Sequence, residues 1–174
     1  EVIKDGKSEG ARARANIFFV AYTLDDVPPG ERRPVSFAFN GGPGSSAIWL
    51  HLGLLGPRRV RLDDEGYTTV PAGELVPNEL SLLTHSDLVL IDPVGTGFSR
   101  MLAGEQVDEL HEYQRDVESI AEFIRIYCTR HARWASPKYL IGESYGTARA
   151  CGVAAHLLER HGMYLDGLAL LSCA

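Results

Sequence analysis

Short apolar runs alternate along the chain with longer amphipathic stretches, and the apolar runs are where strands are expected. The run at 88–91 reads Leu-Val-Leu-Ile, which is typical of a strand buried on both faces of a parallel sheet. The run at 16–24 is rich in aromatic and β-branched residues, which favour extended backbone. Strands are predicted at 16–24, 35–39, 88–91, 138–141 and 165–171.

Helices are expected where the spacing of apolar residues changes to three or four positions. This spacing extends from about 106 to 130 and predicts one helix with an apolar face. Small residues after the run at 138–141 predict a second helix that can pack closely on a sheet. A short helical turn is expected at 48–55, and Gly66 is expected to turn a hairpin within 60–77. The alternation predicts an α/β fold with a mostly parallel sheet and helices on both faces.

Composition narrows the function classes. The 174 residues suffice for one domain with one sizeable core, and 45% hydrophobic with 23% charged residues is ordinary for a globular protein. The net charge of −6 argues against a nucleic-acid binder that works by neutralising phosphates. No apolar run is long enough to span a bilayer. Three cysteines are too few for a disulfide scaffold.

The strongest chemical signal is the pentapeptide GESYG at 142–146, which fits G-x-S-x-G between a predicted strand and a predicted helix. A sharp turn there would push the Ser144 hydroxyl beyond the sheet edge, and Gly142 and Gly146 would leave room for it. The amide of Tyr145 would then lie at a helix N-terminus, where it can donate to an oxyanion. The alternative is a chance pentapeptide in a glycine-containing loop.

A second glycine-rich segment, NGGPGSS at 40–46, follows an earlier predicted strand. This is where a second oxyanion amide is expected in a hydrolase with such an elbow. Taken alone, the segment could equally be a turn that binds nothing.

Together, NGGPGSS at 40–46, DPVGTGFS at 92–99 and GESYG at 142–146 resemble the motifs of the serine carboxypeptidases in sequence, order and spacing. The resemblance covers nearly the whole chain, and the segment 48–60 looks more like the bacterial branch of that family. It implies an α/β-hydrolase catalytic domain over residues 1–174, without metal or cofactor. By itself the segment 92–99 is interpreted as a structural turn, and the resemblance implies only that it supports the site.

The resemblance also implies the role of each site residue. Ser144 matches the nucleophile, and the amides of Gly42 and Tyr145 match the oxyanion hole. Asn40, the amide of Gly41 and Glu143 match the group that binds the free C-terminal carboxylate of a peptide.

A carboxyl beside the nucleophile would repel an anionic substrate unless the pair of carboxyl groups shares a proton, which predicts the best binding in acid. The alternative for Glu143 is a strand-end residue paired with a nearby arginine. The sequence departs from the family at two positions. Ser45 stands where many relatives have cysteine, so a disulfide at that loop is not expected. Leu54 stands where many have a second glutamate, so the carboxylate site is expected to be weaker or less acid-dependent than in those relatives.

The Asp and His of a catalytic triad are expected downstream of the nucleophile in this fold. His156, His161 and Asp166 follow Ser144, but their positions on its own helix and on the next strand make them poor candidates. The chain also begins without Met and ends within a predicted strand. We therefore expect an N-terminal portion that stops at about the sixth strand and is inactive when isolated. His51, His85 and His131 are expected to be solvated or packed.

The function predicted from these residues is hydrolysis of the C-terminal peptide bond through an acyl-enzyme, with peptides that carry a free C-terminus as substrates. An esterase or acyltransferase would use the same acyl-enzyme. A binding scaffold without a base is the non-enzymatic alternative. Export would suit a degradative peptidase, by analogy only, and nothing in the residues predicts an oligomeric state.

Overall fold

The computed structural model describes residues 3–4, 7–8, 13–28, 31–68, 70–71, 73–103 and 112–173. Its central sheet has five strands in the order β11-β10-β5-β8-β4. The strands β5, β8, β10 and β11 run parallel, and β4 pairs antiparallel with β8 at one edge. Their bounds are β4 (Phe19–Tyr22), β5 (Val35–Phe39), β8 (Asp87–Ile91), β10 (Lys138–Glu143) and β11 (Gly167–Leu171). The predicted mostly parallel sheet is confirmed.

The remaining described strands form three small antiparallel pairs. The predicted strand 16–24 divides, because its first part pairs with the segment after β8 and only the second part joins the central sheet. The segment 60–77 forms a hairpin of its own, in which Gly66 has a φ of 88°. The pairs are β1 (Ile3–Lys4) with β2 (Lys7–Ser8), β3 (Ala15–Asn16) with β9 (Arg100–Met101), and β6 (Arg58–Val60) with β7 (Leu75–Pro77).

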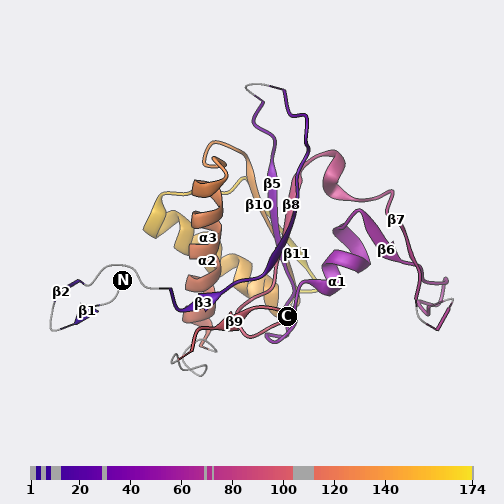
Figure 1. Cartoon of the computed structure of the whole chain (residues 1–174), viewed down its shortest axis with the longest axis horizontal. Coiled ribbons are helices and arrows are strands. Elements are labelled where there is room, and N and C mark those ends of the chain that lie inside the picture. The colour runs from indigo at the N-terminus through magenta and orange to yellow at the C-terminus, as the bar shows by residue number, and fades with distance from the viewer. Residues whose placement is uncertain are drawn as a thin grey trace.

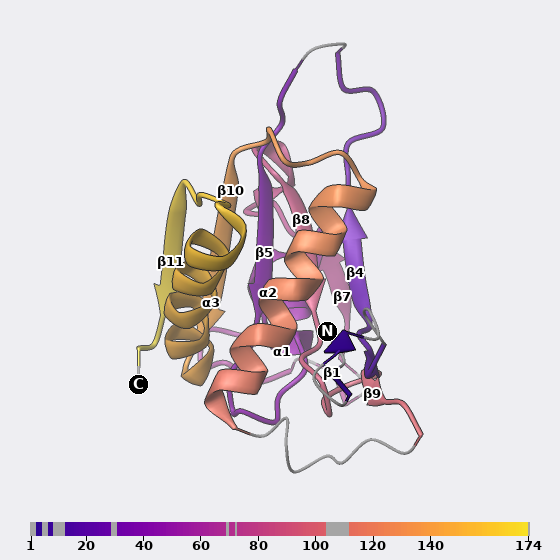
Figure 2. The same cartoon turned by 90° about the vertical axis from the view of Figure 1, so that its left-hand side faces the viewer.

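Helices cover both faces of the sheet, as Figure 1 shows. The helices α2 (Tyr113–Arg130) and α3 (Tyr145–His161) lie side by side on one face, in front of the strands in Figure 2. The short helix α1 (Ile48–Leu50) continues into a π-helical turn, η1 (His51–Leu55), on the other face. A 3₁₀ turn, η2 (Leu82–Thr84), precedes β8. The predicted helix 106–130 is confirmed from 113 onward, while 106–111 lies outside the described residues.

Two apolar cores form because successive side chains of a strand point to opposite faces. Phe37 and Phe39 of β5 join the core under α2 and α3, whereas Ala38 joins the core under α1 and η1. Every residue of β5 and β8 is buried. Burial on both faces removes the need for alternating polar positions, which explains why these strands are apolar except at Ser36 and Asp87, whose buried side chains are hydrogen-bonded.

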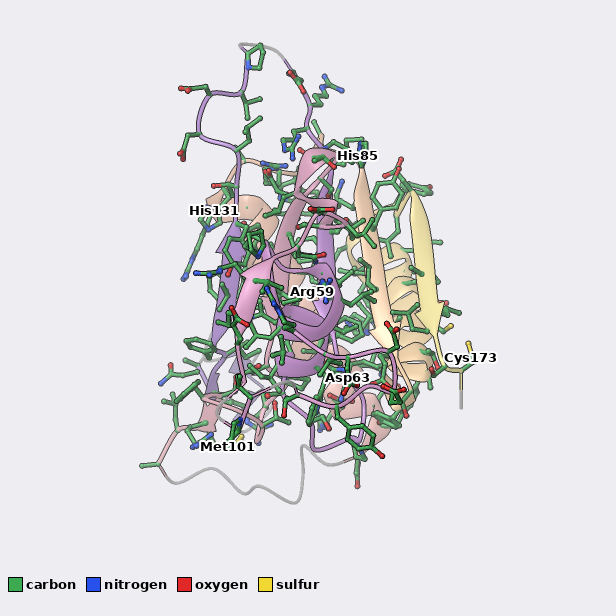
Figure 3. The ribbon with its side chains drawn as sticks, turned by 90° about the vertical axis from the view of Figure 1, so that its right-hand side faces the viewer. Arg59, Asp63, His85, Met101, His131 and Cys173 are labelled. Carbon is green, nitrogen blue, oxygen red and sulfur yellow. The ribbon has the colours of Figure 1, made fainter. Side chains whose placement is uncertain are left out.

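A buried charge cluster fixes the amino-terminal end of the parallel strands. Both Asp87 carboxylate oxygens are paired, Oδ1 with Arg33 Nε at 2.7 Å and Oδ2 with Arg133 Nη1 at 2.6 Å. Figure 3 labels His85 and His131 at this end, whereas Cys173 lies at the other end, beyond the carboxyl end of β11. Neither histidine is therefore near Ser144, and both are exposed, which fits the expectation that they are solvated or packed.

The fold predicts that Cys128 is unreactive in the native protein. Burial in the core raises the pKa of its thiol to about 11, although Lys138 and Arg133 oppose this. Because the thiolate is the nucleophile, iodoacetamide at pH 8 should modify exposed Cys151 and leave Cys128 intact. Mass-spectrometric mapping before and after unfolding in urea checks this. Equal modification of both cysteines in the native protein would contradict the packing of α2.

Candidate active site

The nucleophile turn lies at the junction of β10 and α3. Ser144 is the residue between them, with φ of 54° and ψ of −126°, a strained conformation for a residue with a side chain. Its amide donates to the Leu171 carbonyl at 2.9 Å. Its carbonyl accepts from Thr147 twice, from the amide at 2.8 Å and from Oγ1 at 2.7 Å. These hydrogen bonds hold Ser144 in place at the carboxyl end of the sheet.

The two glycines of the motif are required by space. A Cβ on Gly142 would lie 2.1 Å from the Gly146 carbonyl oxygen. A Cβ on Gly146 would lie 2.9 Å from the Phe39 carbonyl oxygen of the neighbouring strand β5. A side chain at either position would therefore clash with the main chain, which is the reason predicted for the two glycines.

The segment 40–46 packs against this turn because β5, which precedes it, is the neighbour of β10. A Cβ on Gly41 would meet the Glu143 carbonyl oxygen and the Tyr145 amide nitrogen, each at 2.6 Å. Gly42 has a φ of 109°, which favours glycine. The two segments predicted to supply oxyanion amides, at Gly42 and Tyr145, thus touch through Gly41.

Asn40 and Glu143 meet directly. Asn40 is only 1% exposed, and its Nδ2 donates to Glu143 Oε2 at 3.1 Å while its Oδ1 accepts from the Leu50 amide at 3.1 Å. Within the described part of the chain, no arginine pairs with Glu143. The structural alternative for Glu143 therefore has no contact to support it here.

A hydrogen bond joins the third motif, at 92–99, to the chain that follows the second motif, at 40–46. Asp92, which follows β8, accepts from the Ala47 amide through Oδ1 at 2.9 Å and from the Phe98 amide through Oδ2 at 3.1 Å. Ser99 Oγ donates to the Asp92 carbonyl at 2.6 Å. A Cβ on Gly97 would lie 1.9 Å from Asp92 Oδ2, so this turn closes only around glycine. One carboxylate thus joins the loop 92–99 to the segment that follows Asn40.

His51 lies beside a recess of about 230 Å³ between Phe18, Ile48 and Phe98. Its Nε2 is 2.8 Å from the Tyr22 hydroxyl. Burial lowers the pKa of His51, although the Asp92 charge opposes this. It is a packed residue, as expected.

The downstream residues are not near Ser144. His156 lies 12 positions further along α3, about 18 Å at the rise of an α-helix. His161 is the last residue of α3. Asp166 Oδ2 accepts from the Lys138 amide at 2.8 Å, at the amino end of β10 and therefore at the opposite end of that strand from Ser144.

Sequence reasoning missed Arg149, which is 1% exposed. Its Nε lies 2.8 Å from Asp116 Oδ2, and its Nη1 donates to the Asn40 carbonyl at 2.6 Å. A signal was available: Arg149 is in phase with Gly146 and Val153 on the buried face of α3, as Asp116 is with the apolar positions of α2. Two opposite charges on facing apolar stripes indicate a buried pair.

Among the described residues, no group of three or more His, Cys, Asp or Glu side chains is placed to hold a metal ion. None of the helices in the described part is both long and apolar enough to cross a membrane.

A parallel sheet with a strand–serine–helix turn and an adjoining glycine loop defines an α/β-hydrolase. The proline iminopeptidase of Mycobacterium smegmatis shares this fold, with a TM-score of 0.52 at 17% identity over 88% of this chain and 39% of that one. The family model described as serine carboxypeptidase matches residues 8–170. The chain belongs to the serine carboxypeptidase family.

Similar proteins come from fungi and plants. The pheromone-processing carboxypeptidase KEX1 of Saccharomyces cerevisiae is 32% identical over 135 residues, 74% of this chain and 17% of that protein. Serine carboxypeptidase-like 36 of Arabidopsis thaliana is 28% identical over 159 residues, 88% and 30% respectively. The crystal structure of KEX1, a prohormone-processing carboxypeptidase from Saccharomyces cerevisiae, superposes with a TM-score of 0.64 at 28% identity, covering 94% of this chain and 36% of that one. The chain therefore spans about a third of that crystallised protein and a smaller share of the curated relatives, and membership of a bacterial branch stays a prediction.

Proposed function

We propose that the protein is a serine-type carboxypeptidase that hydrolyses the C-terminal peptide bond of peptides. The observation that carries the proposal is the contact of Asn40 Nδ2 with Glu143 Oε2, adjacent to the strained Ser144. An amide and a carboxyl group beside a nucleophile suit recognition of a carboxylate whose carbon is three bonds from the scissile carbonyl carbon. Both cores lie against one sheet, which supports assigning residues 1–174 to a single catalytic domain.

In the proposed reaction, Ser144 Oγ attacks the scissile carbonyl carbon and its proton passes to a general base. The oxyanion accepts hydrogen bonds from the amides of Gly42 and Tyr145. The C–N bond then breaks, the C-terminal residue leaves as an amine after taking up the proton, and water hydrolyses the acyl-enzyme.

The role of Glu143 follows from charge. Two ionised carboxyl groups in contact repel, whereas one shared proton gives a short hydrogen bond. Binding of a free-acid substrate therefore takes up or retains a proton, is complete in acid, and weakens as the pH rises and that proton is lost. An amidated substrate lacks this dependence.

The experiment compares a blocked dipeptide as the free acid and as the C-terminal amide, from pH 4 to 8, in the full-length protein. We expect higher kcat/KM for the free acid, fading toward pH 8. Glu143→Gln should raise KM for the free acid and flatten its pH dependence, because the shared proton is no longer available. Glu118→Gln, on the surface of α2, is the matched control and should change neither.

Equal kcat/KM for the two peptides in the unmodified protein would contradict the carboxypeptidase proposal. Ester turnover without cleavage of either peptide would instead identify an esterase or acyltransferase, and the assignments of Asn40, Gly41 and Glu143 would then be wrong.

A further inference from the structure

We propose that Arg149 is a positioning residue for carboxylate recognition, because its guanidinium holds the main chain of Asn40 and thereby sets the Asn40 side chain against Glu143. The proposal rests on the carboxypeptidase function proposed above. Arg149 does not contact the carboxylate in this role, and it acts through Asn40 alone.

The Arg149 guanidinium is buried and contacts two acceptors and two aromatic rings of the described residues. Its Nη1 donates to the Asn40 carbonyl at 2.6 Å, and its Nε lies 2.8 Å from Asp116 Oδ2. The rings of Phe39 and Tyr145 lie 5.5 and 5.1 Å from its central carbon. A planar cation that contacts two aromatic rings and two fixed acceptors has little freedom to move.

Stability alone does not account for this pair. Removing two charges from water costs several kcal/mol per ion, and well-packed apolar residues often stabilise a core as much or more. Arg149 and Asp116 lie on helix faces whose other buried positions are largely apolar or small. Two apolar side chains in place of Arg149 and Asp116 could not donate a hydrogen bond to the Asn40 carbonyl, whereas the charged guanidinium does.

That carbonyl belongs to the first residue after β5, where the chain leaves the sheet. Arg149 fixes the main chain of Asn40, the Leu50 amide fixes its Oδ1, and its Nδ2 is then directed at Glu143. A displacement of about 1 Å in such a site can cost about a hundredfold in rate.

The test uses two variants of the full-length protein. Arg149→Met combined with Asp116→Leu removes both charges, so that neither is left buried without a partner. Arg149→Lys keeps the charge but loses the planar fork, so it can serve one acceptor well but not both. For each variant, kcat and KM are measured with the free acid, the amide and a blocked ester.

We expect the double variant to raise KM for the free acid by about ten- to a hundredfold, with kcat for the blocked ester within about threefold of the unmodified protein. The KM of Arg149→Lys for the free acid should lie between those of the unmodified protein and the double variant. The matched control is Arg133→Lys, which makes the same change in an arginine that pairs with a buried aspartate at the other end of the sheet. It should lower the melting temperature and leave the preference for the free acid unchanged.

A preference for the free acid that survives in both Arg149 variants would overturn the proposal while leaving the carboxypeptidase function in place. The same holds if Arg133→Lys reduces the preference as much as Arg149→Lys, since the effect would then be general to the fold. If the double variant does not fold, Arg149→Lys against Arg133→Lys decides. If the unmodified protein shows no preference for the free acid over the amide, the proposed carboxypeptidase function is itself contradicted. This comparison is made before any variant is prepared.

Discussion

Replacing Ser144 by alanine is expected to abolish covalent labelling by a fluorophosphonate and to reduce kcat by about a millionfold, as loss of the nucleophile does in other serine hydrolases. The hydroxyl is the atom that forms the acyl-enzyme, and neither the Asn40–Glu143 pair nor an oxyanion donor can replace it. The fold should persist, because the hydrogen bonds of Ser144 to Leu171 and Thr147 involve its main chain. Labelling in a gel and the melting temperature measure the two effects separately.

Ser119→Ala is the matched control for this prediction. Its hydroxyl donates to the Asp116 carbonyl within α2 and is not part of the site, so labelling should be retained. Labelling that persists in Ser144→Ala would place the nucleophile at another residue and remove the mechanism proposed here.

The second large effect is expected for Gly41→Ala. The added methyl group would lie 2.6 Å from two main-chain atoms of the nucleophile turn, the Glu143 oxygen and the Tyr145 nitrogen. Main-chain atoms cannot rotate away, so the segment 40–46 must move off the turn and take the Gly42 amide with it. We expect kcat/KM to fall by about 10²–10³, the usual cost of losing one oxyanion donor. Overpacking should also cost about 1–3 kcal/mol in the free energy of unfolding.

Gly44 offers a control in the same segment. A Cβ there would meet no atom within 4 Å, so Gly44→Ala should keep both kcat/KM and the urea midpoint close to those of the unmodified protein. If Gly41→Ala also leaves kcat/KM unchanged, the contact between the segment 40–46 and the nucleophile turn does not matter for turnover.

Most of the central sheet could be predicted because burial on both faces imposes a sequence pattern. The strands β5 and β8 have no solvent-facing positions, so apart from the buried Ser36 and Asp87 they are apolar and easily recognised. The antiparallel edge was harder. Residues of β4 alternate between half-buried and exposed, and the break before Phe19 arises from pairing with segments far along the chain.

The site was predictable where its physics is local. A serine held at a positive φ between glycines leaves a five-residue signature, because the clash that each glycine avoids is with the turn itself or its neighbouring strand. The contact of Asn40 with Glu143 spans 103 positions, and only the resemblance to a family pointed to it. Arg149 left no local motif, only its place among the buried positions of α3, because its partners Asp116 and Asn40 lie 33 and 109 positions away.

The carboxylate of Asp92 has a consequence for how the chain can change in length. It bonds the Ala47 amide, 45 positions earlier, and the Phe98 amide, six positions later, so the loop 92–99 closes on a fixed span. An inserted or deleted residue there would pull on the glycine segment and displace Asn40. In the described part of the hairpin of β6 and β7, no side chain makes such a bond to the site, and a Cβ on Gly66 would meet nothing within 4 Å. Insertions acquired during divergence should therefore accumulate between Val60 and Leu75 and be rejected between Asp92 and Ser99.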